Sequence, residues 1–234
     1  MMADTTNQDQ RVAVVTGGAG GIGSAIVGRL SPDHNVISLD RTGDFGVDLS
    51  VADDVRRVAN LVLERHGRCD VFVHAAATFA WAPLEKVDLD TWRQIQAVNV
   101  ESALLLTQAF VPGMRERAFG RVIFIVSNTF WSPPDGDMLP YVASKGALIG
   151  LTRTLAVGLG VDGIAVTAVA PGLTRTPAST SRSETEFAET KARQSLPRTL
   201  MPDDTAAVVA MLARDDAAAL TGQTLIADGG LVMR

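Results

Sequence analysis

The chain has 234 residues, of which 47% are hydrophobic, so it is long enough for one well-packed core in a single domain, residues 1–234. Its formal net charge of −5 argues against nucleic acid or an anionic membrane surface as a partner, and no apolar run approaches the ~18 residues of a membrane span. Cys69 is the only cysteine, which excludes an internal disulfide, and the polar first ten residues lack the features of a signal peptide, so we expect a cytoplasmic protein.

Short β-branched runs alternate with longer stretches of helical spacing along the chain. The expected strands are residues 12–15, 36–39, 71–73, 122–126, 164–169 and 224–227. The expected helices are residues 22–30, 51–66, 91–117, 141–159 and 203–212. This alternation predicts an α/β fold in which crossover helices cover both faces of a parallel sheet. Residues 177–198 are polar and poorly periodic, so we expect either a mobile substrate lid or a disordered segment there.

Five glycines lie in the sequence TGGAGGIG, residues 16–23, between the first expected strand and the first expected helix. Glycines at this junction let a phosphate approach the backbone and the helix N-terminus. A P-loop would need Lys and then Ser or Thr after the last glycine, but Ser24 and Ala25 follow here, so that motif is excluded. Two overlapping dinucleotide motifs fit the spacing, namely Gly18-x-Gly20-x-x-Gly23 and Gly17-x-x-x-Gly21-x-Gly23.

Asp40 ends the second expected strand about 20 residues downstream, where a carboxylate accepts hydrogen bonds from the hydroxyls of an adenosine ribose. NADP carries a phosphate on one of those hydroxyls, and two like charges ~4 Å apart cost about 4 kcal/mol at an intermediate dielectric. We therefore expect NAD as the cofactor. Arg41 could swing in to neutralise the phosphate, but its side chain should point away from that of Asp40 if the strand continues.

The sequence YVASKGALIGLTRTLA, residues 141–156, places Tyr141 and Lys145 four residues apart on one face of an expected helix. A free phenol has a pKa of about 10 and exchanges protons poorly at neutral pH. An ammonium group ~4 Å away would lower the pKa of the phenol by about three units, into the range where a general acid or base works best. A Tyr-x-x-x-Lys sequence alone also occurs as a chance surface pair, so its meaning depends on the other motifs.

Taken together, the motifs resemble those of the short-chain dehydrogenase/reductase family. The features that carry the resemblance, in the family's order, are TGGAGGIG, Asp40, Asp48-Leu49, Asn99 in AVNV, Ser127, Tyr141-x-x-x-Lys145, PGLTRTP and LTGQTLIADGG. The resemblance covers essentially the whole chain and implies a Rossmann-like, doubly wound parallel sheet of about seven strands. Within the family, VDLDTW, SNTF and TGQTLIADGGLVM look like the branch that contains 1-phenylethanol dehydrogenase and pyridoxal 4-dehydrogenase.

The resemblance also implies a role for each matched side chain. Tyr141 would be the catalytic acid/base, and Lys145 would hold the nicotinamide ribose and lower the pKa of the tyrosine. Ser127 would hydrogen-bond the substrate oxygen, and Asn99 would position a water molecule that relays protons from Lys145. The implied cofactor-binding residues are Gly17, Gly20, Gly21, Ile22, Gly23, Asp40, Arg41, Asp48, Leu49, Ala75, Ala76, Tyr141, Lys145, Pro171, Gly172, Thr174 and Thr176.

The chain departs from the family's pattern at three places. The usual Asn-Asn-Ala-Gly reads His74-Ala75-Ala76-Ala77, so we expect His74 to take the structural role of the first asparagine and the lost glycine to crowd the cofactor slightly. Only residues 41–47 separate Asp40 from Asp48, so the third strand should be short and the wall on the adenine side thin. Ser127 lies one residue farther from Tyr141 than usual, and SPPDGD should absorb the extra residue as a bulged loop.

The substrate is predicted from a few aromatic side chains. Phe79, Trp81, Phe130 and Trp131 lie in the two loops expected over the nicotinamide, and Phe187 lies in the expected lid, although each could instead pack in the core or at an interface. These loops hold no cluster of Arg or Lys, which argues against a phosphorylated or strongly acidic substrate. An apolar or aromatic secondary alcohol and its ketone fit better.

Three alternatives remain beside this dehydrogenase. A 3-ketoacyl thioester reductase would share every catalytic residue, whereas a sugar-nucleotide epimerase would need a larger C-terminal region. A non-catalytic dinucleotide sensor would have no need of Ser127, Tyr141 or Lys145. The three histidines, His34, His66 and His74, lack the spacing of metal ligands, so we expect no metal. The family's long helices pack against those of other subunits, which implies a homotetramer.

Overall fold

The computed structural model describes residues 10–180 and 182–234. Residues 1–9, on which the expectation about a signal peptide rests, and Ser181 of the expected lid lie outside the described part. Its sheet has the order β2-β1-β3-β4-β5-β6, and every neighbouring pair is parallel. The strands are β1 (Val12–Thr16), β2 (Asn35–Leu39), β3 (Val71–His74), β4 (Gly120–Ile125), β5 (Ile164–Pro171) and β6 (Thr224–Ala227). The expected parallel α/β sheet is confirmed, but the described chain forms six strands and not about seven.

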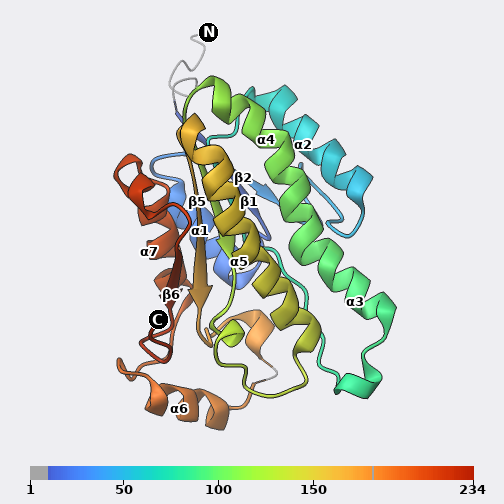
Figure 1. Ribbon diagram of the computed structural model, residues 1–234, viewed down its shortest axis with the longest axis vertical. Helices are drawn as coiled ribbons and strands as arrows, with labels where there is room; N and C mark the ends of the chain where they lie inside the picture. Colours follow the sequence, from blue (N-terminus) through green and yellow to red (C-terminus); the bar gives the residue numbers. More distant parts are fainter. Residues whose placement is uncertain (1–9, 181) are drawn as a thin grey trace.

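Helices cover both faces of the sheet (Figure 1). The helices are α1 (Gly21–Leu30), α2 (Ala52–His66), α3 (Leu89–Gln96), α4 (Ser102–Glu116), α5 (Leu139–Leu159), α6 (Glu184–Arg193) and α7 (Pro202–Leu212). Because side chains alternate along a strand, Val12 and Val14 of β1 pack on the face covered by α2, α4 and α5. Ala13 and Val15 pack on the opposite face, against α1 and α7. The near-continuous apolar strands are therefore buried on both sides.

Two expected segments differ from the structure. The helix predicted over residues 91–117 is divided into α3 and α4 by a turn of π-helix, Ala97–Glu101, which contains Asn99. The segment 177–198, expected to be irregular, contains a short 3-10 helix (Pro177–Ser179) and the whole of α6. Further 3-10 turns are Leu84–Lys86, Asn128–Phe130, Gly160–Asp162 and Asp215–Leu220.

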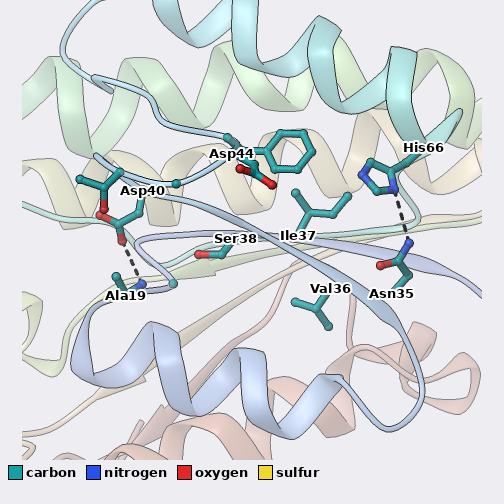
Figure 2. Close-up of a pocket in the computed structure, with 12 residues that line it drawn as sticks. Ala19, Asn35, Val36, Ile37, Ser38, Asp40, Asp44 and His66 are labelled. Carbon is teal, nitrogen blue, oxygen red and sulfur yellow. Dashed lines mark hydrogen bonds between the residues drawn. The ribbon is translucent and has the colours of Figure 1, made fainter.

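The missing seventh strand leaves β2 at the edge of the sheet. The short connection 41–47 makes a single bridge between Asp40 and Gly46, and no other strand of the described chain pairs with the outer side of β2. An open cavity of about 480 Å³ follows this edge. Figure 2 shows Val36 and Ser38 on its α1 side and Ile37 on the opposite side. The wall on the adenine side is therefore thin, as expected. Between Asp40 and Asp48, where a short strand was expected, the chain forms only the bridge between Asp40 and Gly46.

The expectation that no segment approaches a membrane span needs a correction. Residues Leu139–Asp162, which comprise α5 and the turn after it, have the length and the mean hydropathy, 1.2, of a spanning helix. In this fold α5 lies on the sheet against β5 and buries Lys145, Leu148 and Thr152. The core helix of a globular protein meets the same criteria of length and composition.

Candidate active site

The glycine turn joins β1 to the N-terminus of α1 and leaves no room for side chains. Gly17 has a φ of +70°, and a Cβ there would lie 2.8 Å from the Cα of Ala76. A Cβ on Gly23 would collide with the carbonyl oxygen of Gly17. Gly20 is the N-cap of α1, no side chain caps the helix, and the first turn carries no acidic residue. The backbone N–H groups and the positive end of the helix dipole can therefore receive a phosphate.

The carboxylate of Asp40 is held beside this turn at the end of β2. Its Oδ2 accepts a 2.9 Å hydrogen bond from the N–H of Ala19 (Figure 2). Its Oδ1 accepts one of 2.8 Å from the N–H of Arg41. Asp40 borders the cavity along β2, whereas Arg41 and Asp48 line a second cavity of about 520 Å³. Hydrogen bonds from Ser50, with a smaller contribution from the charge of Arg41, lower the pKa of Asp48. Arg41 thus lies near Asp48, beside the second cavity.

The catalytic candidates Ser127 and Tyr141 meet at the carboxyl end of the sheet. Ser127 follows β4 and is buried, and its hydroxyl oxygen accepts hydrogen bonds from the N–H (3.2 Å) and the hydroxyl (2.9 Å) of Thr129. Tyr141 lies in the first turn of α5. Burial raises the pKa of its phenol, while a hydrogen bond with the Ser127 side chain lowers it. Residues 132–137, the SPPDGD segment, form neither helix nor strand, which is consistent with the bulged loop expected there.

Lys145 does not act on Tyr141 as expected. Its Nζ donates a 2.7 Å hydrogen bond to the carbonyl oxygen of Ile125 and lies 5.4 Å from the centre of the Tyr141 ring. Burial lowers the pKa of Lys145 to about 7, because the buried ammonium form is poorly solvated. The pKa of Tyr141 nevertheless shifts upward, because burial of its phenol outweighs the hydrogen bond with Ser127. The expected lowering is wrong for these surroundings, because burial of the phenol itself raises its pKa.

Asn99 is fully buried in the π-helical turn between α3 and α4. Its Oδ1 accepts a 2.8 Å hydrogen bond from the N–H of Thr78, and its Nδ2 donates to the Thr78 carbonyl (2.9 Å) and to the hydroxyl of Ser144 (3.0 Å). Asn99 thereby ties the loop after β3 to α5. A π-helical turn inside a helix often marks a functional position, a signal that the amino-acid pattern did not carry.

The segment after β5 folds over the glycine turn. A Cβ on Gly21 would lie 2.7 Å from the Cβ of Thr176. The hydroxyl of Thr174 donates a 3.0 Å hydrogen bond to the carbonyl of Gly172, just beyond Pro171 at the end of β5. These residues are thus close to the place where the phosphates are expected.

The lid candidate continues from this segment, and Figure 1 places α6 beyond the carboxyl ends of the strands. A capping box formed by Ser183 and Glu186 starts α6, and this S-x-x-E signal was present in the sequence. Arg182 pairs with Glu186 at 2.7 Å, and its guanidinium lies 4.8 Å from the centre of the Trp81 ring. The lid is therefore in contact with the loop after β3.

The aromatic candidates divide into two pairs. The ring of Phe79 packs edge-on against Tyr141, with centroids 6.2 Å apart, and against Trp81 at 4.7 Å. Phe130 instead contacts Trp131 and faces Gly146 of α5. Phe79 and Trp81 are exposed beside Tyr141, whereas Trp131 packs against the core. Phe187, in α6, is buried beneath the guanidinium of Arg175.

Asp228 is a buried site residue that the sequence motifs did not single out. Its carboxylate accepts 3.0 Å hydrogen bonds from Nδ2 of Asn128, the neighbour of Ser127, and from the N–H groups of residues 230–232. Gly172 packs directly against it, since a Cβ there would lie 2.8 Å from the Cβ of Asp228. The C-terminal ADGG sequence was a visible signal, but only the fold brings it beside Ser127.

The fold and site are those of a dinucleotide-dependent oxidoreductase, and comparison with known proteins agrees. The model of the family described as Enoyl-(Acyl carrier protein) reductase matches residues 33–232. The chain therefore belongs to the short-chain dehydrogenase/reductase family.

Known relatives cover nearly the whole chain. Dehydrogenase/reductase SDR family member 4 from Oryctolagus cuniculus is 32% identical over 96% of this chain and 94% of its own length. The 3-oxoacyl-[acyl-carrier-protein] reductase FabG from Thermotoga maritima is 30% identical over 95% and 98%. A structure from Beutenbergia cavernae, proposed to be an NAD(P) dependent gluconate 5-dehydrogenase and holding NADP at low occupancy, superposes with a TM-score of 0.88, 32% identity, and coverage of 94% of this chain and 96% of its own.

Proposed function

We propose that the protein is an NAD-dependent dehydrogenase that interconverts an apolar or aromatic secondary alcohol and its ketone. The observation that carries the proposal is the meeting of the Ser127 and Tyr141 hydroxyls beside buried Lys145, under the exposed face of Phe79. Such a site offers two oxygen-bound protons to one substrate oxygen and an apolar surface to the rest of the substrate.

Separate groups of residues would bind the cofactor and transfer the proton. Bound NAD would supply the hydride acceptor for the alcohol carbon. The glycine turn and α1 would hold its phosphates, Asp40 its adenosine ribose, and the segment after β5 its nicotinamide end. Ser127 would stabilise the substrate oxygen, and Tyr141 would take the hydroxyl proton as general base or return it to the ketone as general acid. Lys145, whose pKa is about 7, can exchange a proton near neutral pH.

The choice of an aromatic substrate rests on the Phe79–Trp81 pair and on the resemblance to the branch that contains 1-phenylethanol dehydrogenase and pyridoxal 4-dehydrogenase. Arg175, just before the lid, and Arg182, within it, are each paired with a glutamate of α6, so neither offers an uncompensated charge to an acidic substrate.

The test is a spectrophotometric screen of secondary alcohols with NAD and NADP, including an aromatic and an aliphatic series. We expect oxidation of aromatic secondary alcohols with NAD preferred. A catalytic efficiency with NADP equal to or above that with NAD would contradict the cofactor assignment. Absence of activity with every alcohol and ketone, together with tight NAD binding, would instead indicate the dinucleotide sensor.

A 3-ketoacyl thioester reductase is the second candidate, supported by the Thermotoga maritima relative. A short acyl thioester assayed in the same screen separates the two, since it requires reduction of a ketone next to a thioester. The net charge of −5 disfavours an acidic acyl carrier as a partner and therefore favours the free alcohol. We also propose that the protein acts in the cytoplasm as a homotetramer.

A further inference from the structure

His74, which stands where the family usually has asparagine, is buried and bonded at both ring nitrogens. It ends β3 and is 0% exposed. Its Nδ1 lies 3.0 Å from Oγ1 of Thr16, the residue before the glycine turn, and its Nε2 lies 3.2 Å from the carbonyl oxygen of Asn99. The two contacts point to opposite sides of the site, the dinucleotide side and the catalytic side.

The hydrogen-bond partners determine the direction of each bond. The Thr16 hydroxyl oxygen accepts 3.1 Å hydrogen bonds from the N–H groups of both Ala75 and Ala76, which occupy its two lone pairs. Its single proton must therefore be donated to Nδ1 of His74. A neutral imidazole then carries its proton on Nε2 and donates it to the Asn99 carbonyl, and the pKa of His74, lowered to about 3 by burial, keeps the ring neutral.

From Asn99 the same network continues to the catalytic helix. The Nδ2 of Asn99 donates to the Ser144 hydroxyl at 3.0 Å, and Ser144 donates to the carbonyl oxygen of Tyr141 at 2.7 Å. All four residues of this network are fully buried, namely Thr16, His74, Asn99 and Ser144. Water therefore does not compete for these bonds. The chain of bonds ends on backbone groups at both ends and therefore holds atoms in place without conducting protons.

We infer that His74 is a positioning residue that sets the distance between the glycine turn and Tyr141. This inference rests on the proposed dehydrogenase function, because hydride transfer needs the dinucleotide and the acid/base held in one geometry. The family's asparagine is one bond shorter than histidine on the Nε2 side and would reach Thr16 but not the Asn99 carbonyl. The longer ring bridges both.

Two substitutions of His74 test the hydrogen bonds of its two ring nitrogens separately. In His74→Asn the amide occupies the Nδ1 position and can keep the Thr16 bond, whereas in His74→Gln it reaches the Nε2 position and can keep the bond to Asn99. We expect His74→Asn to lower kcat about tenfold, with KM and the Kd for NAD changed less than about threefold, because the loss is one of alignment. His74→Gln should stay within about threefold of the unmodified kcat.

Thr16 provides a second matched pair if either histidine variant fails to fold. Thr16→Val removes the bond to His74 together with the bonds from the N–H groups of Ala75 and Ala76, and it should lower kcat. Thr16→Ser keeps all three bonds and should restore kcat. Equal kcat values for His74→Asn and His74→Gln, or losses that simply follow the unfolding midpoints of the variants, would overturn the inference and leave His74 as a space-filling core residue.

Amide hydrogen exchange tests the network without any enzymatic assay. The N–H of Thr78, bonded to Asn99 Oδ1, should exchange faster in His74→Asn than in His74→Gln. If the unmodified protein oxidised no alcohol, the proposed function would fail while this readout still tested the position of Asn99. Equal exchange rates at Thr78 in the two variants would contradict the inference by itself.

Discussion

The Nζ of Lys145 donates a 2.7 Å hydrogen bond to the carbonyl oxygen of Ile125, the last residue of β4. This bond anchors the catalytic helix α5 to the middle of the sheet and holds a lysine that is 1% exposed. Burial lowers the pKa of Lys145 from 10.5 to about 7, so the buried ammonium group destabilises the folded protein at neutral pH. The same lysine lies beside Tyr141, where catalysis needs it. Removing the lysine should therefore have opposite effects on activity and on folding.

We predict that Lys145→Met abolishes turnover but raises the free energy of unfolding by about 2–4 kcal/mol at pH 7 and below, after allowing for the lost hydrogen bond. The unfolded lysine, with its ordinary pKa of 10.5, binds more protons than the folded one between about pH 7 and 10.5. Its destabilising effect is therefore complete below pH 7 and disappears toward pH 10.5. Urea unfolding of both proteins across this range checks the prediction, and a difference that did not shrink with rising pH would contradict it.

Tyr141→Phe should eliminate turnover while the Kd for NAD changes little, because the substitution removes the transferable proton and keeps the ring that packs against Phe79. Steady-state assays and a fluorescence titration with NAD measure the two quantities. Retention of more than about a tenth of the unmodified turnover would show that another group supplies the proton.

Asp40→Ala should narrow the preference for NAD over NADP. The substitution removes the negative charge that would repel the ribose phosphate of NADP. This repulsion is about 4 kcal/mol, and even half of it gives more than a tenfold preference for NAD. It also removes the hydrogen bonds that hold the Ala19 and Arg41 N–H groups, so NAD binding itself should weaken. The ratio of kcat/KM for the two cofactors is the measurement. Asp53→Ala, at an exposed carboxylate of α2 outside both cavities, is the control that should leave the ratio unchanged.

The lid, residues 177–198 with α6, should be mobile without ligand and ordered over a bound substrate, as closure excludes water from hydride transfer. Arg182 lies on the Trp81 ring and pairs with Glu186, so it links the lid to the loop after β3. We expect Arg182→Ala to raise KM about fivefold with a smaller effect on kcat, and Arg182→Lys to restore part of the loss. Equal hydrogen-exchange protection of this segment in the free and ternary states would argue against a lid.

A homotetramer is expected because α5 presents apolar side chains to solvent. Val157 is 84% exposed and Val161, in the turn after α5, is 92% exposed. Such side chains together with the apolar helix face are costly on a monomer. Light scattering at micromolar concentration should give the mass of four chains, and Val157→Glu should reduce it. Val51→Glu, at the start of α2, serves as the control, and a monomer mass for the unmodified chain would refute the prediction.

The sequence predicted the fold well because its signals were local and periodic. The apolar runs at 12–15 and 122–126 could only be buried strands, and the glycines of the first turn restricted what could follow β1. The number of strands was wrong because it came from the family and not from the seven residues that separate Asp40 from Asp48, which form one bridge. Helix α6 was missed because its polar composition hid a capping box at Ser183.

The candidate site was predictable in its members but not in its electrostatics. Spacing on a helix placed Tyr141 near Lys145, yet it could not show that the lysine is bonded to Ile125 and largely desolvated. For the same reason the upward shift in the pKa of Tyr141 was unpredictable, since burial is a property of the whole fold. Asp228 lies 100 residues from Asn128 in sequence, so no local pattern could join them.

The open edge at β2 also bears on how the protein associates with itself. Asn35 and Leu39 bond inward to β1, so the backbone N–H and C=O groups of Val36 and Ser38 face outward, where a strand from another chain could pair with them. The edge is only five residues long and is flanked by charged Asp33 and Arg41, both of which discourage such pairing. The short length of β2 and the flanking charges therefore protect this edge from pairing with another chain, as an additional strand outside β2 would. A longer or more apolar β2 would favour aggregation.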